Sequence, residues 1–364
     1  MYPLADGLFA PRNQWYVAAW SREVTRKPME RWVLDEPVAF YRKEDGAAVA
    51  VAGRCPHRSF PLGKSRVIGD NIQCGYHGIT FQPDGSCARV PSQKAIPNAC
   101  RIKSYPLAER WKWIWIWPGD PAAADESLIP DHFEIGLTDP SYHCAGDLYN
   151  FVDGRYMLMH DNLFDLTHLN YLHKDTFGGV EGTEMVPECL TGPGWVGSRY
   201  AQRDVYPSSR FMELLNYRDK VDVVVGLKLL MPCLHVGGGE HYYPATHPRA
   251  GQLLGAEKYY HAITPATRHT THYFYGAGRT WEHPDPDHSQ KLVDGVDPGL
   301  KEDVYATENI ERMIQHYGGR PGELLLRADN VCARGRRFFE TLIRKELEPQ
   351  SSQASERVQL AENT

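Results

Sequence analysis

The sequence lacks three features that would assign it to a specialised class of protein. No segment approaches the ~20 consecutive apolar residues of a transmembrane helix. The first twenty residues contain Asp6 and two prolines, where a signal peptide requires a basic start and an unbroken apolar run. A net charge of −6 and an isoelectric point near 6.2 do not show the basic excess of nucleic-acid-binding proteins. We therefore expect a cytoplasmic protein that binds neither membranes nor nucleic acids.

Cysteine is too sparse and too irregularly spaced to indicate a disulfide framework. The eight cysteines are scattered between Cys55 and Cys332, and a chain of 364 residues can bury a sizeable core without disulfide bonds. This usage favours a reducing compartment. The hydrophobic fraction of 42% and the charged fraction of 24% are those of an ordinary globular protein.

The residues that are present divide the chain into two parts. Up to about residue 122, short alternating segments flank the turn pairs Asp45-Gly46 and Asp84-Gly85, a pattern typical of β-hairpins. This part is predicted to be an all-β domain, residues 1–122. Residues 123–350 mix helical and strand-like segments, with helices expected over 156–173 and from near Glu302 and Ala328. The polar residues 351–364 are expected to be a frayed tail.

Four possible metal ligands occur in two short pairs within the first part. Cys55 and His57 form C-x-H, and after sixteen residues Cys74 and His77 form C-x2-H. Structural zinc is the alternative for two cysteines and two histidines. However, each pair here mixes one cysteine with one histidine, which favours a two-iron cluster in which one iron takes both thiolates and the other both imidazoles.

A second set of possible ligands lies in the predicted helix 156–173. Asn162, Asp165, His168 and His173 form N-x2-D-x2-H-x4-H. A five-residue step places the two histidines roughly 140° apart on an ideal helix. They can share one metal only if the helix is bulged or broken between them. Otherwise they are satisfied core residues.

Two histidines need one carboxylate to complete a facial triad. The candidates are Asp285, Asp287, Asp294, Asp297, Glu302 and Asp303. Helical phase puts Asp303 in register with Thr307, Ile310 and Tyr317 on an apolar stripe, where a charge needs a cation or hydrogen-bond donors. The alternative is that Asp303 only caps the helix.

These motifs together resemble the Rieske non-heme iron oxygenases. The resemblance extends from "NQWYVAAW" through "HAITPATRHTTHYF" to "ADNVCARGRRFFETLI", and it is greatest for the vanillate and dicamba O-demethylase type. Ile79 departs from many ring dihydroxylases, which carry Trp at that position. The resemblance implies an α+β chain: an N-terminal all-β Rieske domain, then an α+β catalytic domain of helix-grip (START-like) fold with an antiparallel sheet.

The resemblance also implies roles for individual residues. Cys55, His57, Cys74 and His77 would hold a [2Fe-2S] cluster, and His168, His173 and Asp303 a mononuclear Fe(II). Asn162 and Asp165 would be catalytic. In a homotrimer, Asp165 would connect the iron site to His77 of the neighbouring subunit, the alternative being that Asp165 only orients His168.

The implied activity is that of a monooxygenase. Electrons from NAD(P)H would arrive through a reductase, with or without a ferredoxin, and O2 would oxidise a small aromatic substrate by O- or N-demethylation. Ring or benzylic hydroxylation or dihydroxylation is the alternative. A Rieske electron carrier is a further alternative, which the second ligand set disfavours.

Two groups of side chains are candidates for binding partners. The histidines that could bind substrate are His235, His261, His269 and His272, although a histidine taken alone is more often a packing or surface residue. A basic group, made of Arg54, Arg58, Lys64 and Arg66, lies beside the cluster motifs and could bind an acidic electron donor, or be only a solvated face.

Overall fold

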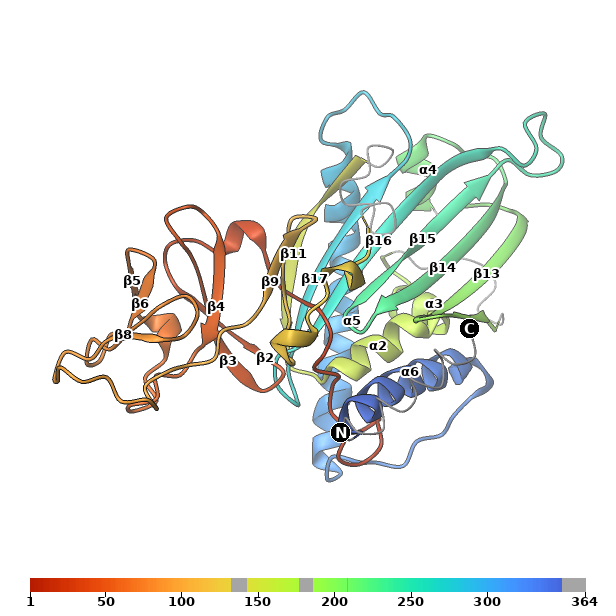
Figure 1. Ribbon diagram of the computed structural model, residues 1–364. Helices are drawn as coiled ribbons and strands as arrows, with labels where there is room; N and C mark the ends of the chain where they lie inside the picture. Colours follow the sequence, from red (N-terminus) through yellow and green to blue (C-terminus); the bar gives the residue numbers. More distant parts are fainter. Residues whose placement is uncertain (132–142, 177–185, 208, 349–364) are drawn as a thin grey trace, which may run out of the picture.

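The computed structural model describes residues 1–131, 143–176, 186–207 and 209–348. These residues form two β-rich parts that lie side by side, with the long helices on the second part (Figure 1). The predicted frayed tail, residues 351–364, lies outside the described residues. No helix in the described ranges is long and apolar enough to cross a membrane.

The N-terminal part contains three small antiparallel sheets, in the strand orders β2-β3-β4, β5-β6-β7-β8 and β1-β10-β9. Their strands are β1 (Tyr16–Trp20), β2 (Met29–Val33), β3 (Glu36–Arg42), β4 (Ala48–Ala52), β5 (Arg66–Ile68), β6 (Asn71–Gln73), β7 (Thr80–Phe81), β8 (Cys87–Arg89), β9 (Leu107–Arg110) and β10 (Trp113–Ile116).

Both predicted hairpin turns are present in this part. Asp45 accepts a hydrogen bond from the backbone N–H of Ala47, and Asp84 accepts one from Ser86. The glycine after each aspartate has a positive φ, which glycine adopts without steric cost. The aspartate side chain and the glycine backbone together close each turn.

The C-terminal part is built on a seven-stranded antiparallel sheet in the order β11-β17-β16-β15-β14-β13-β12. Its strands are β11 (His143–Val152), β12 (Glu188–Gly192), β13 (Trp195–Val205), β14 (Val221–Met231), β15 (Leu234–Tyr242), β16 (Leu253–Pro265) and β17 (Thr271–Arg279). The α-helices are α2 (Tyr156–Phe164), α3 (Leu169–Leu172), α4 (Ser209–Leu215), α5 (His288–His316) and α6 (Asn330–Leu347). Helix α5 packs on β11 and β17 and against α2, which also contacts α6. The predicted α+β fold class is confirmed.

The predicted start of the second helix was wrong. Helix α5 begins at His288, well before the expected start near Glu302, and it includes Pro298. Proline and the glycines around it normally end a helix. Here Leu292, Val296 and Leu300 are buried on one face, so that packing against the sheet compensates for the lost hydrogen bond.

A single hydrophobic core joins the two parts. The rings of Trp20 and Trp113 in the first part contact Phe274 and Tyr260 in the second. The Trp20 indole also donates to the backbone oxygen of Leu148, at 3.0 Å. The position of the metal-binding loops relative to the large sheet is therefore fixed by buried aromatic contacts.

Candidate active site

The two predicted cluster loops have the same backbone arrangement. In each loop the cysteine N–H donates to the carbonyl five residues later, Phe60 or Ile79, and the cysteine carbonyl accepts from the N–H four residues later. That fourth residue, Ser59 or Gly78, has a positive φ in both loops. The two cysteines are therefore held by the same kind of turn, and the contact between the rings of His57 and His77 brings the two loops together at one place.

In these two loops the cysteine side chains are buried and the histidine side chains are exposed. Cys55 and Cys74 are only 1% and 2% exposed, and burial together with the adjacent Cys74 thiol raises the pKa of Cys55. The rings of His57 and His77 are exposed and lie 4.6 Å apart.

This separation fits a two-iron cluster with an inner thiolate iron and an outer imidazole iron. A single zinc ion would draw the four ligand atoms together at bonds of about 2.0–2.3 Å. Among the described residues, the only three or more ligand atoms within 4.8 Å of one another belong to a different set, His168, His173 and Asp303.

The segment that carries this second set is not one continuous helix. Helix α2 ends at Phe164, because Asp165 adopts an extended conformation and its side chain accepts from the N–H and hydroxyl of Thr167. Such side-chain bonds compete with the helix. A short 3-10 turn then leads through His168 into α3, which ends before His173. The prediction of one helix over 156–173 was wrong. The break lies at Asp165, before His168, and not between the two histidines, and His173 lies just past the end of α3.

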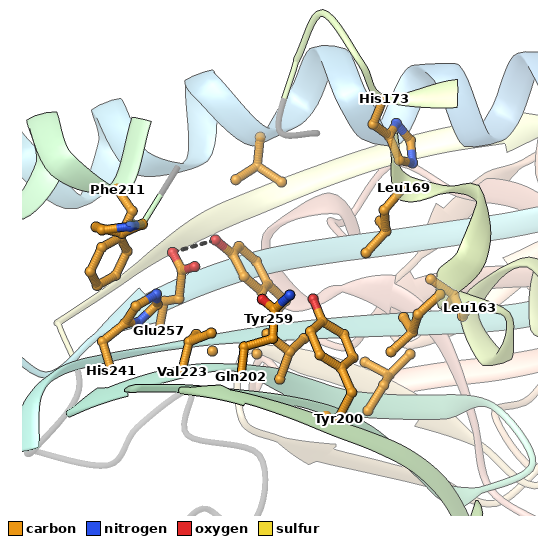
Figure 2. A pocket seen from close by; sticks show the side chains of 18 of the residues that line it. Leu163, Leu169, His173, Tyr200, Gln202, Phe211, Val223, His241, Glu257 and Tyr259 are labelled. Atoms are coloured by element: carbon orange, nitrogen blue, oxygen red, sulfur yellow. Dashed lines mark hydrogen bonds between the residues drawn. The ribbon is translucent and has the colours of Figure 1, made fainter. Parts of the chain in front are cut away.

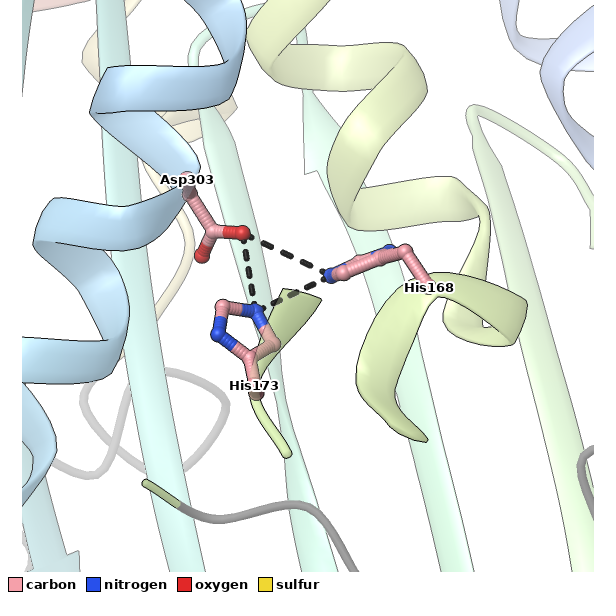
Figure 3. Close-up of side chains that lie close together, drawn as sticks. All are labelled: His168, His173 and Asp303. Atoms are coloured by element: carbon pink, nitrogen blue, oxygen red, sulfur yellow. Dashed lines mark hydrogen bonds and ion pairs between the residues drawn. The ribbon is translucent and has the colours of Figure 1, made fainter. Parts of the chain in front are cut away.

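His168, His173 and Asp303 converge on one point (Figure 3). The Nε2 atoms of the two histidines are 3.2 Å apart, and the Oδ1 atom of Asp303 is 3.5 Å from His168 Nε2 and 2.9 Å from His173 Nε2. Ligand bonds of about 2.0–2.2 Å at near right angles require separations of about 3 Å. The three side chains therefore fit a facial triad with open positions on the far side of the metal.

Neighbouring groups hold these three ligands in place. His168 Nδ1 donates to the backbone oxygen of Asp165, and His173 Nδ1 donates to Glu302 Oε2 at 2.7 Å. Asn162 donates to Asp303 Oδ1 at 2.9 Å. Each histidine therefore presents Nε2 to the metal, and the predicted site residue Asn162 is placed against the carboxylate.

The charge of Asp303 is set by its surroundings. Burial raises its pKa, but His168 and His173, when they are protonated at Nε2 and metal is not bound, donate to Asp303 and lower its pKa to about 2. Burial lowers the pKa of His173, and the carboxylates of Asp303 and Glu302 more than reverse this shift. Asp303 is therefore an anion at neutral pH, the form that binds a metal.

The predicted apolar stripe around Asp303 is only partly correct. Asp303 is 2% exposed and shares its buried face with Thr307, but Ile310 and Tyr317 are exposed. The buried position that follows is Glu311, which pairs with Arg155. An ion pair between two buried side chains leaves no sign in a hydrophobic pattern, so the sequence could not reveal it.

A cavity with an empty volume of about 1280 Å³, including its open mouth, extends from the three ligands across the sheet. Figure 2 shows His173 at one end and Phe211, His241 and Glu257 at the other. Most of the lining is apolar or aromatic, including Leu163, Leu166, Leu169, Val223, Val225, Leu227, Val296 and Leu300. Such a lining excludes water and accommodates an aromatic molecule.

Of the four histidines predicted to bind substrate, only His261 lines this cavity. His235 is fully buried against His160, and His269 lies beside Glu311. His272 bonds Tyr149 and the Trp32 carbonyl.

The polar cavity residues that the sequence did not indicate are Tyr200, Gln202, Tyr206, His241 and Glu257. Strand alternation could have pointed to some of them, but not to the pairing that brings β13–β16 together. The predicted basic group, Arg54, Arg58, Lys64 and Arg66, is exposed throughout.

Two family models match the chain. A model of the Rieske [2Fe-2S] domain matches residues 14–106, and a model of the vanillate O-demethylase oxygenase C-terminal domain matches residues 152–345. Both matched ranges lie within the predicted domains 1–122 and 123–350, whose boundaries stay predictions.

Curated relatives match nearly the full length. The chain is 33% identical to the oxygenase component of dicamba O-demethylase from Stenotrophomonas maltophilia, covering 91% of this chain and 97% of that protein. It is 32% identical to the iron-sulfur subunit TsaM1 of the toluene-4-sulfonate monooxygenase system of Comamonas testosteroni (92% and 97% covered). It is 31% identical to the oxygenase component of chloroacetanilide N-alkylformylase from Rhizorhabdus wittichii (strain DC-6 / KACC 16600), with 93% and 97% covered.

Solved structures of a related protein have the same fold over nearly the whole chain. Dicamba monooxygenase bound to 3,6-dichlorosalicylic acid superposes with a TM-score of 0.82 at 33% identity, covering 93% of this chain and 99% of that chain. The same protein with non-heme iron and dicamba gives a TM-score of 0.74 at 32% identity, covering 92% and 98%. With the Rieske match and the three converging ligands, these likenesses confirm the predicted cofactors, a [2Fe-2S] cluster and a mononuclear iron.

Proposed function

The chain belongs to the Rieske non-heme iron oxygenases, as an oxygenase component of the vanillate and dicamba O-demethylase type, and on this premise we propose that it removes a methyl or other alkyl group from an aromatic ether or amine. The relatives named for O-demethylation and N-alkylformylase activity support this choice. The enzyme would work in the cytoplasm, where NAD(P)H is available and thiols stay reduced.

The ligand roles are part of the proposal. Cys55, His57, Cys74 and His77 would hold the cluster. His168, His173 and Asp303 would hold the iron, which when bound supplies O2 activation for inserting one oxygen atom into a substrate C–H bond. Insertion next to oxygen or nitrogen gives a hemiacetal or carbinolamine, which collapses and releases an aldehyde.

The protein side chains position the reactants and exclude water. Glu302 Oε2 accepts from His173 Nδ1 at 2.7 Å, and Asn162 Nδ2 donates to Asp303 Oδ1 at 2.9 Å. These bonds orient His173 and Asp303 before metal binds. The apolar walls of the cavity hold the aromatic ring against the open side of the triad and keep bulk water away from it.

Electron delivery requires contact between subunits in this proposal. Figure 1 places the N-terminal strands β5 and β6 at one end of the molecule and α3 in the other part. We therefore infer a homotrimer in which His77 of one copy lies against Asp165 of the next. Asp165 Oδ1 accepts two hydrogen bonds from Thr167. In the trimer, the other carboxylate oxygen, Oδ2, would contact His77 of the neighbouring copy.

The reductase or ferredoxin that supplies electrons would bind near the cluster. Arg54, Arg58, Lys64 and Arg66 are exposed beside the cluster loops, in a protein whose net charge is −6. A local basic surface on an acidic protein would steer an acidic electron donor to this end of the molecule.

The observation that carries the proposal is the facial arrangement of His168, His173 and Asp303 at the end of an apolar cavity. A Rieske electron carrier would need neither the triad nor the cavity. Ring or benzylic hydroxylation uses the same two centres, and the experiment must therefore identify the product.

The test is aldehyde release from methoxylated and N-methylated aromatics, assayed with NADH, a generic Rieske-system reductase and O2. We expect formaldehyde in equal amount to the demethylated product. The Asp303→Ala variant should keep the cluster spectrum, lose the third iron per chain and release none. Hydroxylated product without formaldehyde would contradict dealkylation, and full activity in Asp303→Ala would contradict the ligand assignment.

A further inference from the structure

Two cysteines outside the cluster motifs lie opposite each other in the N-terminal part. Ser86 and Arg101 form an antiparallel bridge, and the next pair in that register is Cys87 with Cys100. Both are free thiols and partly exposed. They pack on the same hydrophobic core as the two cysteines of the metal-binding loops. Strand β8, which carries Cys87, lies near β5 and β6 at one end of the molecule (Figure 1).

The two backbone segments are held close enough for a disulfide bond. The Ile102 N–H donates to the Gly85 carbonyl oxygen at 2.9 Å, and a Cβ atom on Gly85 would collide with the Ile102 carbonyl oxygen. Opposite residues of an antiparallel pair have Cα atoms about 4.5–5.5 Å apart and side chains on the same face. Disulfides span Cα separations of about 4.4–6.8 Å. Cys87 and Cys100 can therefore be joined with little movement of the backbone.

The two thiols also contact each other. The Cys87 thiol donates to the Arg89 carbonyl oxygen at 3.5 Å. Burial and a hydrogen bond with the Cys87 side chain raise the pKa of Cys100 to about 11. A bond that raises the pKa is one in which the thiol donates, so the Cys100 S–H points to Cys87 Sγ. Cys100 is therefore protonated at neutral pH, and the first reaction with an oxidant falls to Cys87.

The segment between these cysteines, residues 88–99, packs on one of the metal-binding loops. Residues 91–99 are all exposed. Gly78, which follows the predicted ligand His77, is in contact with this segment, since a Cβ atom on Gly78 would lie 3.2 Å from Pro91 Cγ. A bond between Cys87 and Cys100 would tie the two ends of the segment together and restrict movement of Pro91 away from Gly78.

We propose that Cys87 and Cys100 are a reversible oxidation site, which hydrogen peroxide converts to a disulfide that closes residues 88–99 beside the [2Fe-2S] cluster. This inference is independent of the proposed dealkylation, since it involves neither the substrate nor the cavity. In a reducing compartment such a disulfide is transient.

The reaction takes two steps. The Cys87 sulfur attacks one oxygen of the peroxide: the S–O bond forms, the O–O bond breaks, and the leaving hydroxide takes up the Cys87 thiol proton to give water. The Cys100 sulfur then attacks the Cys87 sulfur: the S–S bond forms, the S–O bond breaks, and the hydroxyl leaves as water with the Cys100 proton. The two thiols lose two electrons and two protons, which the peroxide gains. Exchange with a small thiol such as glutathione restores both cysteines.

The test is peptide mapping of the cluster-loaded protein after treatment with hydrogen peroxide, without reductase or substrate. Remaining thiols are blocked, and the protein is digested with trypsin and chymotrypsin. Cleavage after Phe81 and Arg89 places Cys87 and Cys100 in different peptides, apart from the cysteines of the cluster motifs. We expect peroxide to raise the amount of the linked peptide by about tenfold or more. The visible absorption of the cluster should persist, and dithiothreitol should remove the link.

Serine variants test the role of each cysteine, with a matched control. Cys87→Ser and Cys100→Ser should both lose the linked peptide. In Cys100→Ser the oxidised Cys87 has no second thiol to attack it, so dimedone should trap a sulfenic acid there. The control is Cys189→Ser on β12, because Cys189 is also partly exposed but lies opposite Ser198. It should form the linked peptide as wild type does.

The effect on the cluster is measured separately, as the rate at which its absorption is lost in urea. Oxidised wild-type protein should lose the cluster about threefold or more slowly than reduced protein. Cys100→Ser should show no such slowing after peroxide. Equal rates for oxidised and reduced wild-type protein would overturn the closure of residues 88–99 beside the cluster.

The wild-type map decides the oxidation site even if a serine variant does not fold. A linked peptide in protein that retains its cluster absorption supports the site. Peroxide-treated protein without that peptide overturns it. A link that appears only after the absorption has bleached also overturns it, because the thiols then meet in protein that has lost its cluster.

Discussion

Replacing Glu302 tests how the fold prepares His173 to bind iron. Glu302 Oε2 accepts from His173 Nδ1 at 2.7 Å and from the Thr176 hydroxyl at 2.8 Å. The His173 side chain is fully buried, whereas that of Glu302 is about one-third exposed. Without this carboxylate the imidazole keeps its position by packing but loses the partner that fixes its tautomer and makes Nε2 a stronger donor to metal.

The size of the effect follows from that single bond. Hydrogen bonds to charged groups contribute about 1.5–3 kcal/mol, and every 1.4 kcal/mol corresponds to about a tenfold change in an equilibrium constant. Glu302→Ala should therefore weaken Fe(II) binding by about 10- to 100-fold. Glu302→Gln keeps an acceptor without the charge and should lose less, about threefold to tenfold.

The assay is anaerobic Fe(II) titration of protein from which the mononuclear iron has been removed, with the cluster followed by its EPR signal. Asp294→Asn is the control, since Asp294 is exposed on the same helix and, within the described part of the chain, accepts a side-chain hydrogen bond only from Gln290. If Glu302→Ala binds Fe(II) within twofold of wild type while the control is unchanged, Glu302 does not prepare the ligand.

Three further predictions concern the cluster, the electron path and the fold. Cys55→Ser or His77→Ala should abolish the reduced Rieske EPR signal, because each change removes half of the protein ligands of one iron, and a retained signal would contradict the ligand set. Asp165→Asn should keep both metals and the bond to Thr167 yet reoxidise its reduced cluster more slowly with substrate and O2, and rapid mixing that shows the wild-type rate would exclude the bridge. Arg155→Met should lower the free energy of unfolding in urea by about 3–5 kcal/mol, since it leaves Glu311 charged and buried, whereas breaking the exposed pair of Lys220 and Asp204 should cost less than about 1 kcal/mol.

Local sequence patterns were sufficient for much of this structure. The turns at Asp45 and Asp84 close through the aspartate side chain and the following glycine, so three consecutive residues are enough to determine each turn. The two Cys-His loops are equally local, because each closes on itself through bonds spanning four and five residues. For the same reason the motifs could be assigned to one centre before any fold was known.

Other features depend on contacts between distant segments. Asp165 ends α2 by bonding Thr167, a side-chain bond that competes with an otherwise good helical sequence. Pro298 stays inside α5 because the sheet covers that helix. His241 and Glu257 face one space only because β15 pairs with β16. None of these outcomes can be read from periodicity, since each depends on which segment packs against another.

Helix α5 explains how ligands so far apart in sequence reach one point. Its buried face packs on the sheet through Leu292 and Leu300, places Asp303 in the site and, further along, carries the ion pair of Glu311 with Arg155. Arg155 immediately precedes α2, whose end leads to His168. The ion pair therefore joins the helix that carries the carboxylate to the segment that carries the histidines. Its loss should disturb iron binding as well as stability, because the same contact sets the spacing between α2 and α5.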